Sequence, residues 1–211
     1  ELEVKYVLEG SIRKAADIVR VTVQLLSTED GAHLWTETYE RNLSVADIFA
    51  IQDEIAEGVT GMIAGSYGII SLTDYEQVKR KGTDDLEAYD CVLRLYVYRR
   101  TMGEKKHGEI RDCLERAVKE DPEYSDAWAW LAFMYSQELA AGYNPLPAPL
   151  ERSIKAARRA VEIDPMSGIA HVALARAYFY LGDLDLFFPE AEKSVALNPN
   201  NSDVIATMGY Y

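Results

Sequence analysis

Side chains able to do chemistry are scattered through this sequence of 211 residues. Its three histidines fall in different parts of the chain: His33, His107 and His171. They lack metal-ligand spacing, and there is no serine nucleophile elbow, phosphate-binding loop or paired-cysteine metal knuckle. The carboxylates within residues 53–57 have the spacing of a solvated helical face. We therefore predict a segment that is not an enzyme and has no catalytic, cofactor-binding or metal-binding residues.

Binding chemistry is more evident in the second half of the chain, where aromatic residues accompany one arginine. Phe179 and Tyr180 follow Arg176 by about one helical turn, and a guanidinium can bind a carboxylate through two hydrogen bonds. The candidate contact residues form two sets: Asp126, Ala129, Phe133, Ser136 and Gln137, then Ile169, Val172, Arg176, Phe179 and Tyr180. The alternative is that Phe133 and Phe179 only pack against neighbouring helices, and the sequence leaves both readings open.

A repeated pattern between Leu114 and Asn200 predicts the helices that carry these residues. Small, proline and aromatic residues recur in the same order: Ala117, Pro122, Trp128, Leu131 and Tyr135, then Ala160, Pro165, His171, Leu174 and Tyr178. Pro165 and Pro199 are 34 residues apart (199 − 165), the period of a tetratricopeptide repeat (TPR). Each unit reads as two helices ended by its proline, and one such hairpin cannot bury its apolar stripe alone. An irregular helical bundle would have no reason to keep this period.

The repeat phase also predicts a groove. First helices of stacked units line the concave side, which usually binds a peptide or protein segment, and the ten candidate residues face that side. We expect helix from Leu86 onward, with a first turn at Thr101–Gly108 and a stiff surface loop at Ala141–Pro149. The array has about three repeats, and Tyr211 falls in the first helix of a further one.

The first part of the chain has strand patterns instead. Apolar alternation predicts strands near Val4–Leu8, Val19–Leu25 and Ala32–Tyr39, joined as an antiparallel meander. A helix capped at Ser44 then carries apolar residues at helical spacing from Ile48 onward. One helix on three strands makes a thin domain, so we expect an unprotected sheet edge.

These patterns predict an α+β fold, a small antiparallel sheet with one covering helix followed by an all-α TPR superhelix. Gly82–Asp84 reads as a break followed by a helix cap. We therefore place one domain at residues 1–81, with a connector at its end, and the helical repeats at residues 82–211. For Tyr75–Lys81 the sequence leaves open a short helix or an extended connector.

Composition limits the partners. The net charge of −13 argues against a nucleic-acid surface, and Lys79–Lys81 is the one basic run of note. The longest uncharged run, Gly58–Thr73, has 16 residues and is too short to span a membrane. Cys91 and Cys113 are too few for a disulfide scaffold; we expect half-buried helical thiols, with pairing left open. No signal peptide begins the sequence, so a cytoplasmic location is expected.

Three segments resemble a known domain: residues 6–13 (YVLEGSIR), 31–39 (GAHLWTETY) and 47–55 (DIFAIQDEI). They are similar to the second half of the TolB-like amino-terminal domain, and the resemblance covers residues 1 to about 64 and continues through Leu86–Tyr89. This domain precedes TPR arrays in bacterial multidomain proteins, including many class III adenylate cyclases. The family pattern begins with a further strand–helix–strand segment that this sequence lacks. We find no counterpart of the cyclase metal-binding aspartates.

The resemblance implies a non-catalytic interaction and regulatory module of a bacterial signalling protein, at the C-terminal side of a class III adenylate cyclase. The interaction region of a TPR-containing transcriptional regulator, an envelope assembly protein and an enzyme with an unrecognised site are the alternatives. The expected partner is a protein or peptide in the concave groove. Self-association through the sheet edge or the terminal helix is a second expectation, with no cofactor, nucleic acid or membrane.

Overall fold

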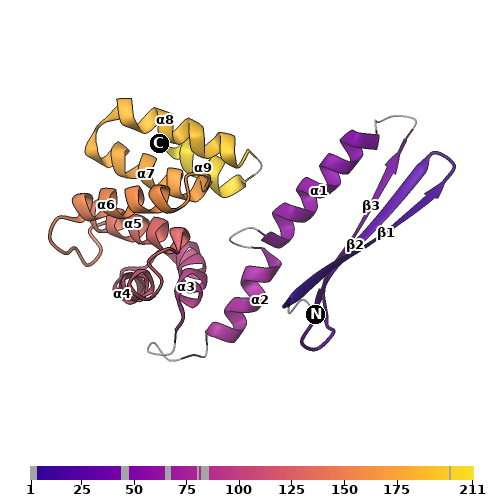
Figure 1. Cartoon of the computed structure of the whole chain (residues 1–211), viewed down its shortest axis with the longest axis horizontal. Coiled ribbons are helices and arrows are strands. Elements are labelled where there is room, and N and C mark those ends of the chain that lie inside the picture. Colours follow the sequence, from indigo (N-terminus) through magenta and orange to yellow (C-terminus); the bar gives the residue numbers. More distant parts are fainter. Residues whose placement is uncertain (1–3, 44–47, 65–67, 80, 82–85, 200) are drawn as a thin grey trace. The chain divides into compact units, whose positions relative to one another are not determined.

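The computed structural model describes residues 4–43, 48–64, 68–79, 81, 86–199 and 201–211 (Figure 1). Within these ranges a three-stranded antiparallel sheet is followed by helices, so the predicted α+β class is confirmed. The chain divides into two compact units, Glu1–Thr73 and Asp74–Tyr211. The boundary predicted at Gly82–Asp84 lies outside the described residues and stays a prediction.

The sheet is a meander of β1 (Tyr6–Ala15), β2 (Ile18–Ser27) and β3 (His33–Asn42), with β2 in the centre. Two residues join β1 to β2, and the β2–β3 turn uses Gly31 at a φ of 69°, a conformation that glycine adopts without strain. The alternation of apolar residues in β2 places Val19, Val21, Val23 and Leu25 on one face of the sheet.

Helix α1 (Ile48–Ala64) covers that face. Its Ile51, Ile55 and Val59 form a buried cluster with Val23 of β2, and Trp35 and Tyr39 of β3 pack against it. Arg41 of β3 forms an ion pair with Glu54 of α1 at 2.5 Å. The predicted cap, Ser44, lies outside the described residues. The described core of this unit therefore joins α1 to β2 and β3.

The connecting segment is helical, not extended. Helix α2 (Ile69–Val78) ends close to where the predicted connector was centred, and Val78 is buried. Asp74 of α2 is also buried and accepts a hydrogen bond of 3.1 Å from the Tyr89 hydroxyl.

Seven helices of the described chain follow: α3 (Ala88–Thr101), α4 (Glu104–Glu120), α5 (Ser125–Ala140), α6 (Pro149–Ile163), α7 (Gly168–Leu181), α8 (Leu184–Leu197) and α9 (Ser202–Tyr210). They form three antiparallel hairpins and the first helix of a fourth (Figure 1). Along the chain, α3 contacts α5, α5 contacts α7 and α7 contacts α9. The first helices of successive hairpins thus form one continuous layer, as the TPR period predicted.

The first turn is shorter than predicted. Only Met102 and Gly103 separate α3 from α4, whereas the sequence suggested a turn through Gly108. Met102 ends α3 in the left-handed region at a φ of 40°, and its N–H bonds to the carbonyl of Tyr98. This cap takes the chain directly into the next helix, so the glycine at 108 is helical.

Small residues allow the hairpins to approach closely. Ala132, Ala160 and Ala175 are at most 1% exposed. Two serine hydroxyls bond to carbonyls of this set: Ser125 to Ala160 at 3.0 Å and Ser153 to Ala132 at 2.9 Å. Each of these bonds joins two helices and satisfies a buried hydroxyl.

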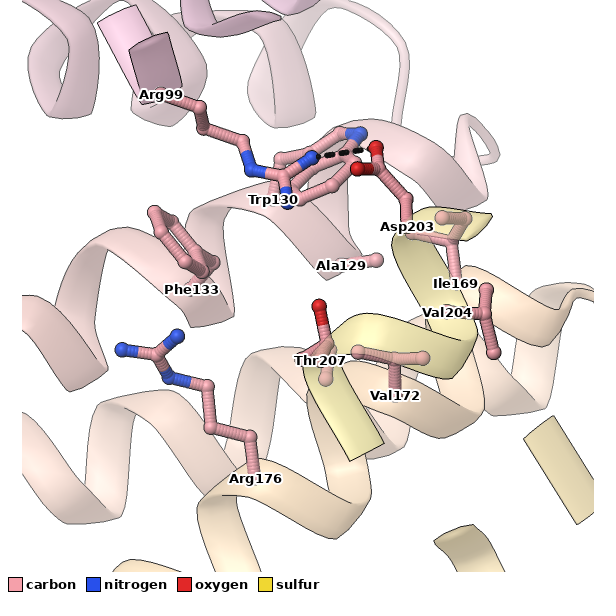
Figure 2. A pocket seen from close by; sticks show the side chains of 11 residues that line it. Arg99, Ala129, Trp130, Phe133, Ile169, Val172, Arg176, Asp203, Val204 and Thr207 are labelled. Atoms are coloured by element: carbon pink, nitrogen blue, oxygen red, sulfur yellow. Dashed lines mark hydrogen bonds and ion pairs between the residues drawn. The ribbon is translucent and has the colours of Figure 1, made fainter. Parts of the chain in front are cut away.

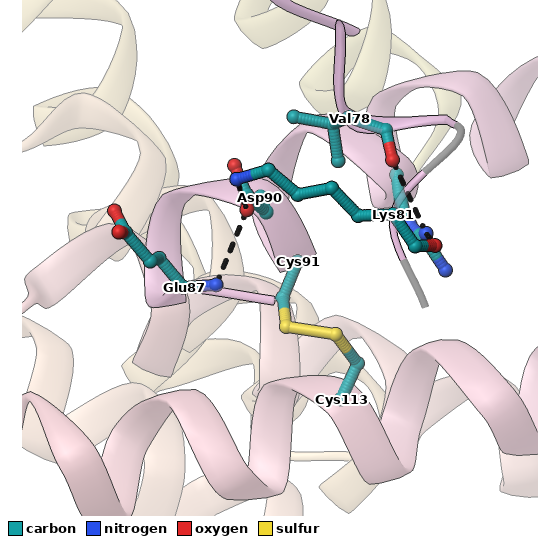
Figure 3. The surroundings of a disulfide bond; sticks show 7 residues. Val78, Lys81, Glu87, Asp90, Cys91 and Cys113 are labelled. Atoms are coloured by element: carbon teal, nitrogen blue, oxygen red, sulfur yellow. Dashed lines mark hydrogen bonds and ion pairs between the residues drawn. A yellow bond between two sulfur atoms is a disulfide. The ribbon is translucent and has the colours of Figure 1, made fainter. Parts of the chain in front are cut away.

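A disulfide joins the two helices of the first hairpin. Cys91 of α3 and Cys113 of α4 are bonded, with Cα atoms 5.6 Å apart (Figure 3). Both residues are at most 3% exposed, so they are more buried than the sequence suggested. Nearby, Asp90 closes a capping box with Glu87 and accepts a 2.6 Å bond from Lys81. The disulfide at Cys91 therefore lies next to Asp90, the residue of α3 that binds Lys81 and the N–H of Glu87.

The loop between α5 and α6 is anchored at a buried carboxylate. Glu138, whose side chain is fully buried, pairs with Arg111 of α4 at 3.1 Å and with Arg152 of α6. It also accepts a 2.8 Å hydrogen bond from the N–H of Leu146 in the loop, and Arg111 donates to the Asn144 carbonyl at 3.0 Å. The prolines alone therefore do not account for the order of this insertion.

Tyr98 carries a buried hydroxyl without a partner among the described residues. Burial raises its pKa to about 12, because the tyrosinate is poorly solvated there. This pKa lies above the unfolded value of about 10, so the folded state favours the neutral phenol. The resulting contribution to the free energy of unfolding is fully present below about pH 10 and is lost as pH rises through about 12.

We expect Tyr98→Phe to stabilise the protein by about 1 kcal/mol near neutral pH, because it removes an unsatisfied buried hydroxyl. This advantage should grow by about 1 kcal/mol between about pH 9 and pH 11, since the wild type must keep the phenol neutral. Urea unfolding at both pH values measures it, with the exposed Tyr210→Phe as the control. A loss of stability in Tyr98→Phe at both pH values would contradict this account.

Candidate peptide-binding groove

The layer of first helices borders a narrow cavity of about 20 Å³, room for about one water molecule (Figure 2). Five of the ten residues predicted from the sequence line it: Ala129, Phe133, Ile169, Val172 and Arg176. They come from α5 and α7, whose contact brings the two sets together. The predicted phase therefore placed half of the candidate set at one cavity.

A wider hollow of about 510 Å³ adjoins this cavity. Gln137 and Tyr180 line it, together with Phe133 and Arg176, which border both spaces. We use the name concave groove for the two spaces and the residues that line them. Its open part has the volume of a small-ligand or peptide-anchor site.

The other three predicted residues line neither space. Ser136 is fully buried and donates to the Phe133 carbonyl at 2.7 Å. Phe179 packs its ring against Phe187 and Tyr211. Asp126 is half-buried, and burial, followed by the charge of Asp164, raises its pKa. These contacts are internal to the described unit.

Several residues of the concave groove were missed from the sequence. They include Arg99 and Trp130, with the α9 residues Asp203, Val204 and Thr207. Arg99 belongs to the first repeat, whose sequence is degenerate, so its groove-facing positions could not be aligned with those of the later repeats. Val204 and Thr207 lie at i and i+3, a helical spacing that could have indicated the groove face of α9 from the sequence.

Arg176 is the most unusual side chain of the concave groove. It is 7% exposed, and its guanidinium lies 4.4 Å from the centre of the Phe133 ring, with Tyr180 and Tyr211 farther away. Burial lowers its pKa, and the neighbouring charge of Arg99 acts in the same direction. Among the described residues no carboxylate forms an ion pair with Arg176. Contacts with aromatic faces therefore stabilise the buried positive charge of Arg176.

Unsatisfied donors at the groove within the described chain include Nε of Arg176 and Nε1 of Trp130. Buried donors normally find acceptors, so donors of this kind beside a cavity suit a ligand that supplies oxygen atoms.

Arg99 shows how the groove holds a carboxylate. Its Nη1 lies 3.0 Å from Oδ2 of Asp203, and its guanidinium is 4.8 Å from the centre of a Trp130 ring (Figure 2). This pair joins α3 to α9 across 104 residues of sequence. An aromatic surface that supports arginine–carboxylate pairing is thus already present at one end of the groove.

Two of the three histidines have internal contacts, whereas His33 is exposed. His107 is buried and its Nε2 lies 3.0 Å from the Met134 carbonyl, and burial lowers its pKa. His171 lies between the Pro165 carbonyl, at 3.0 Å, and the carboxylate of Glu190. Among the described residues no group of three or more His, Cys, Asp or Glu side chains could hold a metal ion. No helix of the described ranges is long and apolar enough to cross a bilayer.

Comparison with known proteins gives one informative sequence relative. The chain is 32% identical over 188 residues to "Putative adenylate cyclase 3" of Rhizobium meliloti (strain 1021). The match includes 88% of this chain but only 31% of the relative, so the chain spans about a third of that protein. No protein-family model matches the chain.

Solved structures with similar helices include a thermophilic TPR protein of Thermus thermophilus, at 16% identity and a TM-score of 0.44, covering 56% of this chain and 66% of that one. MamA AMB-1 is 14% identical with a TM-score of 0.44, covering 66% and 76%, and MamA MSR-1 is 18% identical with 0.42, covering 78% and 85%. These TM-scores are too low to establish a shared fold. The repeat assignment rests on the helical hairpins themselves.

Proposed function

We propose that the helical unit is a non-catalytic interaction module that binds an extended polypeptide segment in the concave groove. The observation that carries this proposal is Arg176, a buried cation that borders both groove spaces and pairs with no described carboxylate. A partner that supplies an acidic side chain there would complete the charge and satisfy the Nε donor. The proposed contact set consists of the seven sequence-predicted residues that line the two spaces: Ala129, Phe133, Gln137, Ile169, Val172, Arg176 and Tyr180.

The partner should combine this acidic group with apolar or aromatic neighbours. Phe133 and Tyr180 lie beside the guanidinium, and Val172 adds apolar surface in the narrow cavity. Aromatic and arginine side chains are the residues that most often dominate binding energy at protein interfaces. An acidic residue flanked by hydrophobic residues fits this arrangement.

We also propose that the chain is the regulatory region of a bacterial signalling protein of the adenylate cyclase type, with a TolB-like unit before the repeats. The 32% identical relative supports this context, and its name supplies the activity only for that protein. A cytoplasmic location and the division at residue 82 belong to the same proposal.

The groove proposal can be tested by selecting peptides from a random library on the whole chain. Wild-type protein should enrich sequences with an acidic residue beside an aromatic or aliphatic one. Arg176→Ala should weaken the selected peptides by about tenfold or more, since it removes a charge-assisted pair in a buried site. The control is Arg159→Ala, a half-buried arginine on α6 that is paired with Glu123 and lines neither groove space. Equal binding by both variants would argue against the groove.

A further inference from the structure

The two edge strands of the sheet unit differ in how far α1 covers their side chains. Strand β3 is tied to α1 by the Arg41–Glu54 pair, and its Trp35 and Tyr39 lie against the helix cluster. Strand β1 pairs with β2 alone among the described strands and has ten residues without proline. Such an edge presents backbone donors and acceptors to any strand that can pair with it.

The hydrogen-bond pattern shows which backbone groups of β1 face outward. The N–H of Thr28 bonds to the carbonyl of Lys5 at 3.0 Å, so odd-numbered residues of this strand turn their polar groups toward β2. Leu8, Gly10, Ile12 and Lys14 therefore direct theirs to the outer edge. Another strand can therefore pair with β1 only in a register that hydrogen-bonds to these even-numbered residues.

Apolar side chains accompany this edge. Leu8 is opposite Leu25 and Ile12 is opposite Val21, so both share the face that α1 covers. They are nevertheless 46% and 72% exposed, because the described helix cluster reaches β2 and β3 only. Gly10 lies between them and leaves a gap in side-chain cover on that face.

The charges on the opposite face are self-complementary. Glu9 and Arg13 lie two residues either side of Ser11 and point to the same face. Arg13 is directly opposite Arg20 of β2, whose charge is already paired with Glu40 at 2.6 Å. Among the described residues Arg13 itself has no ion pair, so a carboxylate beside it would relieve a like-charge contact.

We propose that two copies of this chain pair through their β1 strands, antiparallel about a two-fold axis at Ser11. Glu9 of each copy then faces Arg13 of the other, and Ile12 of each packs over Gly10 of the other. Both pairs obey the parity above: Gly10 and Ile12 exchange hydrogen bonds, and Glu9 and Arg13 occupy the closer, non-hydrogen-bonded position. The isologous contact joins two three-stranded sheets into one continuous sheet. It uses no groove residue, so this inference and the groove proposal fail or succeed separately.

Sedimentation and light scattering of the whole chain over a concentration series test the pairing. The wild type should dimerise, and Glu9→Arg or Arg13→Glu should each raise the dissociation constant about tenfold or more, because each creates two like-charge contacts. The combined Glu9→Arg/Arg13→Glu variant restores opposite charges and should return to within about threefold of wild type. Glu29→Arg, in the β2–β3 turn, is the matched control.

Amide hydrogen exchange gives a second readout. The N–H groups of Leu8, Gly10 and Ile12 should be protected in the dimer and exchange faster on dilution. A chain that stays monomeric at all concentrations, or a dimer that tolerates both single reversals, would overturn the proposal. So would protection of these amides in a monomer of a longer chain, because that would show the edge covered by its own polypeptide.

Discussion

Replacing Glu138 by Ala is expected to destabilise the protein by about 3–5 kcal/mol, one of the two largest effects foreseen for this chain. The fully buried carboxylate balances Arg111, which is buried, and Arg152, which is half-buried, and its loss leaves both cations without this partner. Urea unfolding followed by helical circular dichroism measures the change. The control is Glu123→Ala, whose exposed pair with Arg159 should contribute less than about 1 kcal/mol.

The same substitution should loosen one specific segment. Leu146 loses the acceptor of its N–H, and Arg111 loses the neighbour that holds it near the Asn144 carbonyl. Amide exchange in residues 141–148 should therefore accelerate more than exchange in α7. Unchanged stability in Glu138→Ala would show that the buried ion network is dispensable.

Removing the disulfide is the second large effect. The bond closes 22 residues of chain, and loop-closure entropy for that length corresponds to about 3 kcal/mol. Cys91→Ala/Cys113→Ala should lose about this amount of unfolding free energy relative to oxidised wild type. Reduction of the wild type should produce a similar loss, whereas the double variant should not respond to a reductant.

This comparison also bears on the proposed cytoplasmic location, where reducing systems keep most protein thiols reduced. A reduced chain that still unfolds cooperatively would be compatible with that compartment. Collapse of the first hairpin on reduction would favour an oxidising environment. Equal stability of oxidised wild type and double variant would contradict the predicted contribution of the bond.

Local and periodic features could be predicted from the sequence. Alternation predicted β2, and the hairpins followed from the 34-residue separation of Pro165 and Pro199. The first strand was predicted too short, because β1 runs to Ala15 and not to Leu8. Ala132, Ala160 and Ala175 mark close helix approaches because only a methyl group fits there. The phase derived from these positions placed Phe133 and Arg176 beside the same cavity.

Contacts between distant residues could not be predicted in this way. The Arg99–Asp203 pair depends on how three hairpins curve, which no local spacing records. The burial of Glu138 depends on arginines from α4 and α6 meeting at one point. Phe179 has the spacing of a groove residue, yet its ring contacts Phe187 and Tyr211, because helix curvature decides which positions reach the cavity.

A polypeptide that occupies the concave groove beside Arg176 is the central feature of the proposed function. Site-specific photo-crosslinking with a selected acidic peptide tests this directly, with the crosslinker placed at Val172 in the groove or at Glu162 on the exposed side of α6. The expected result is an adduct from position 172 that disappears when Arg176→Ala is added, and little adduct from position 162. Equal adducts from both positions, or an adduct at 172 that ignores Arg176→Ala, would contradict the account.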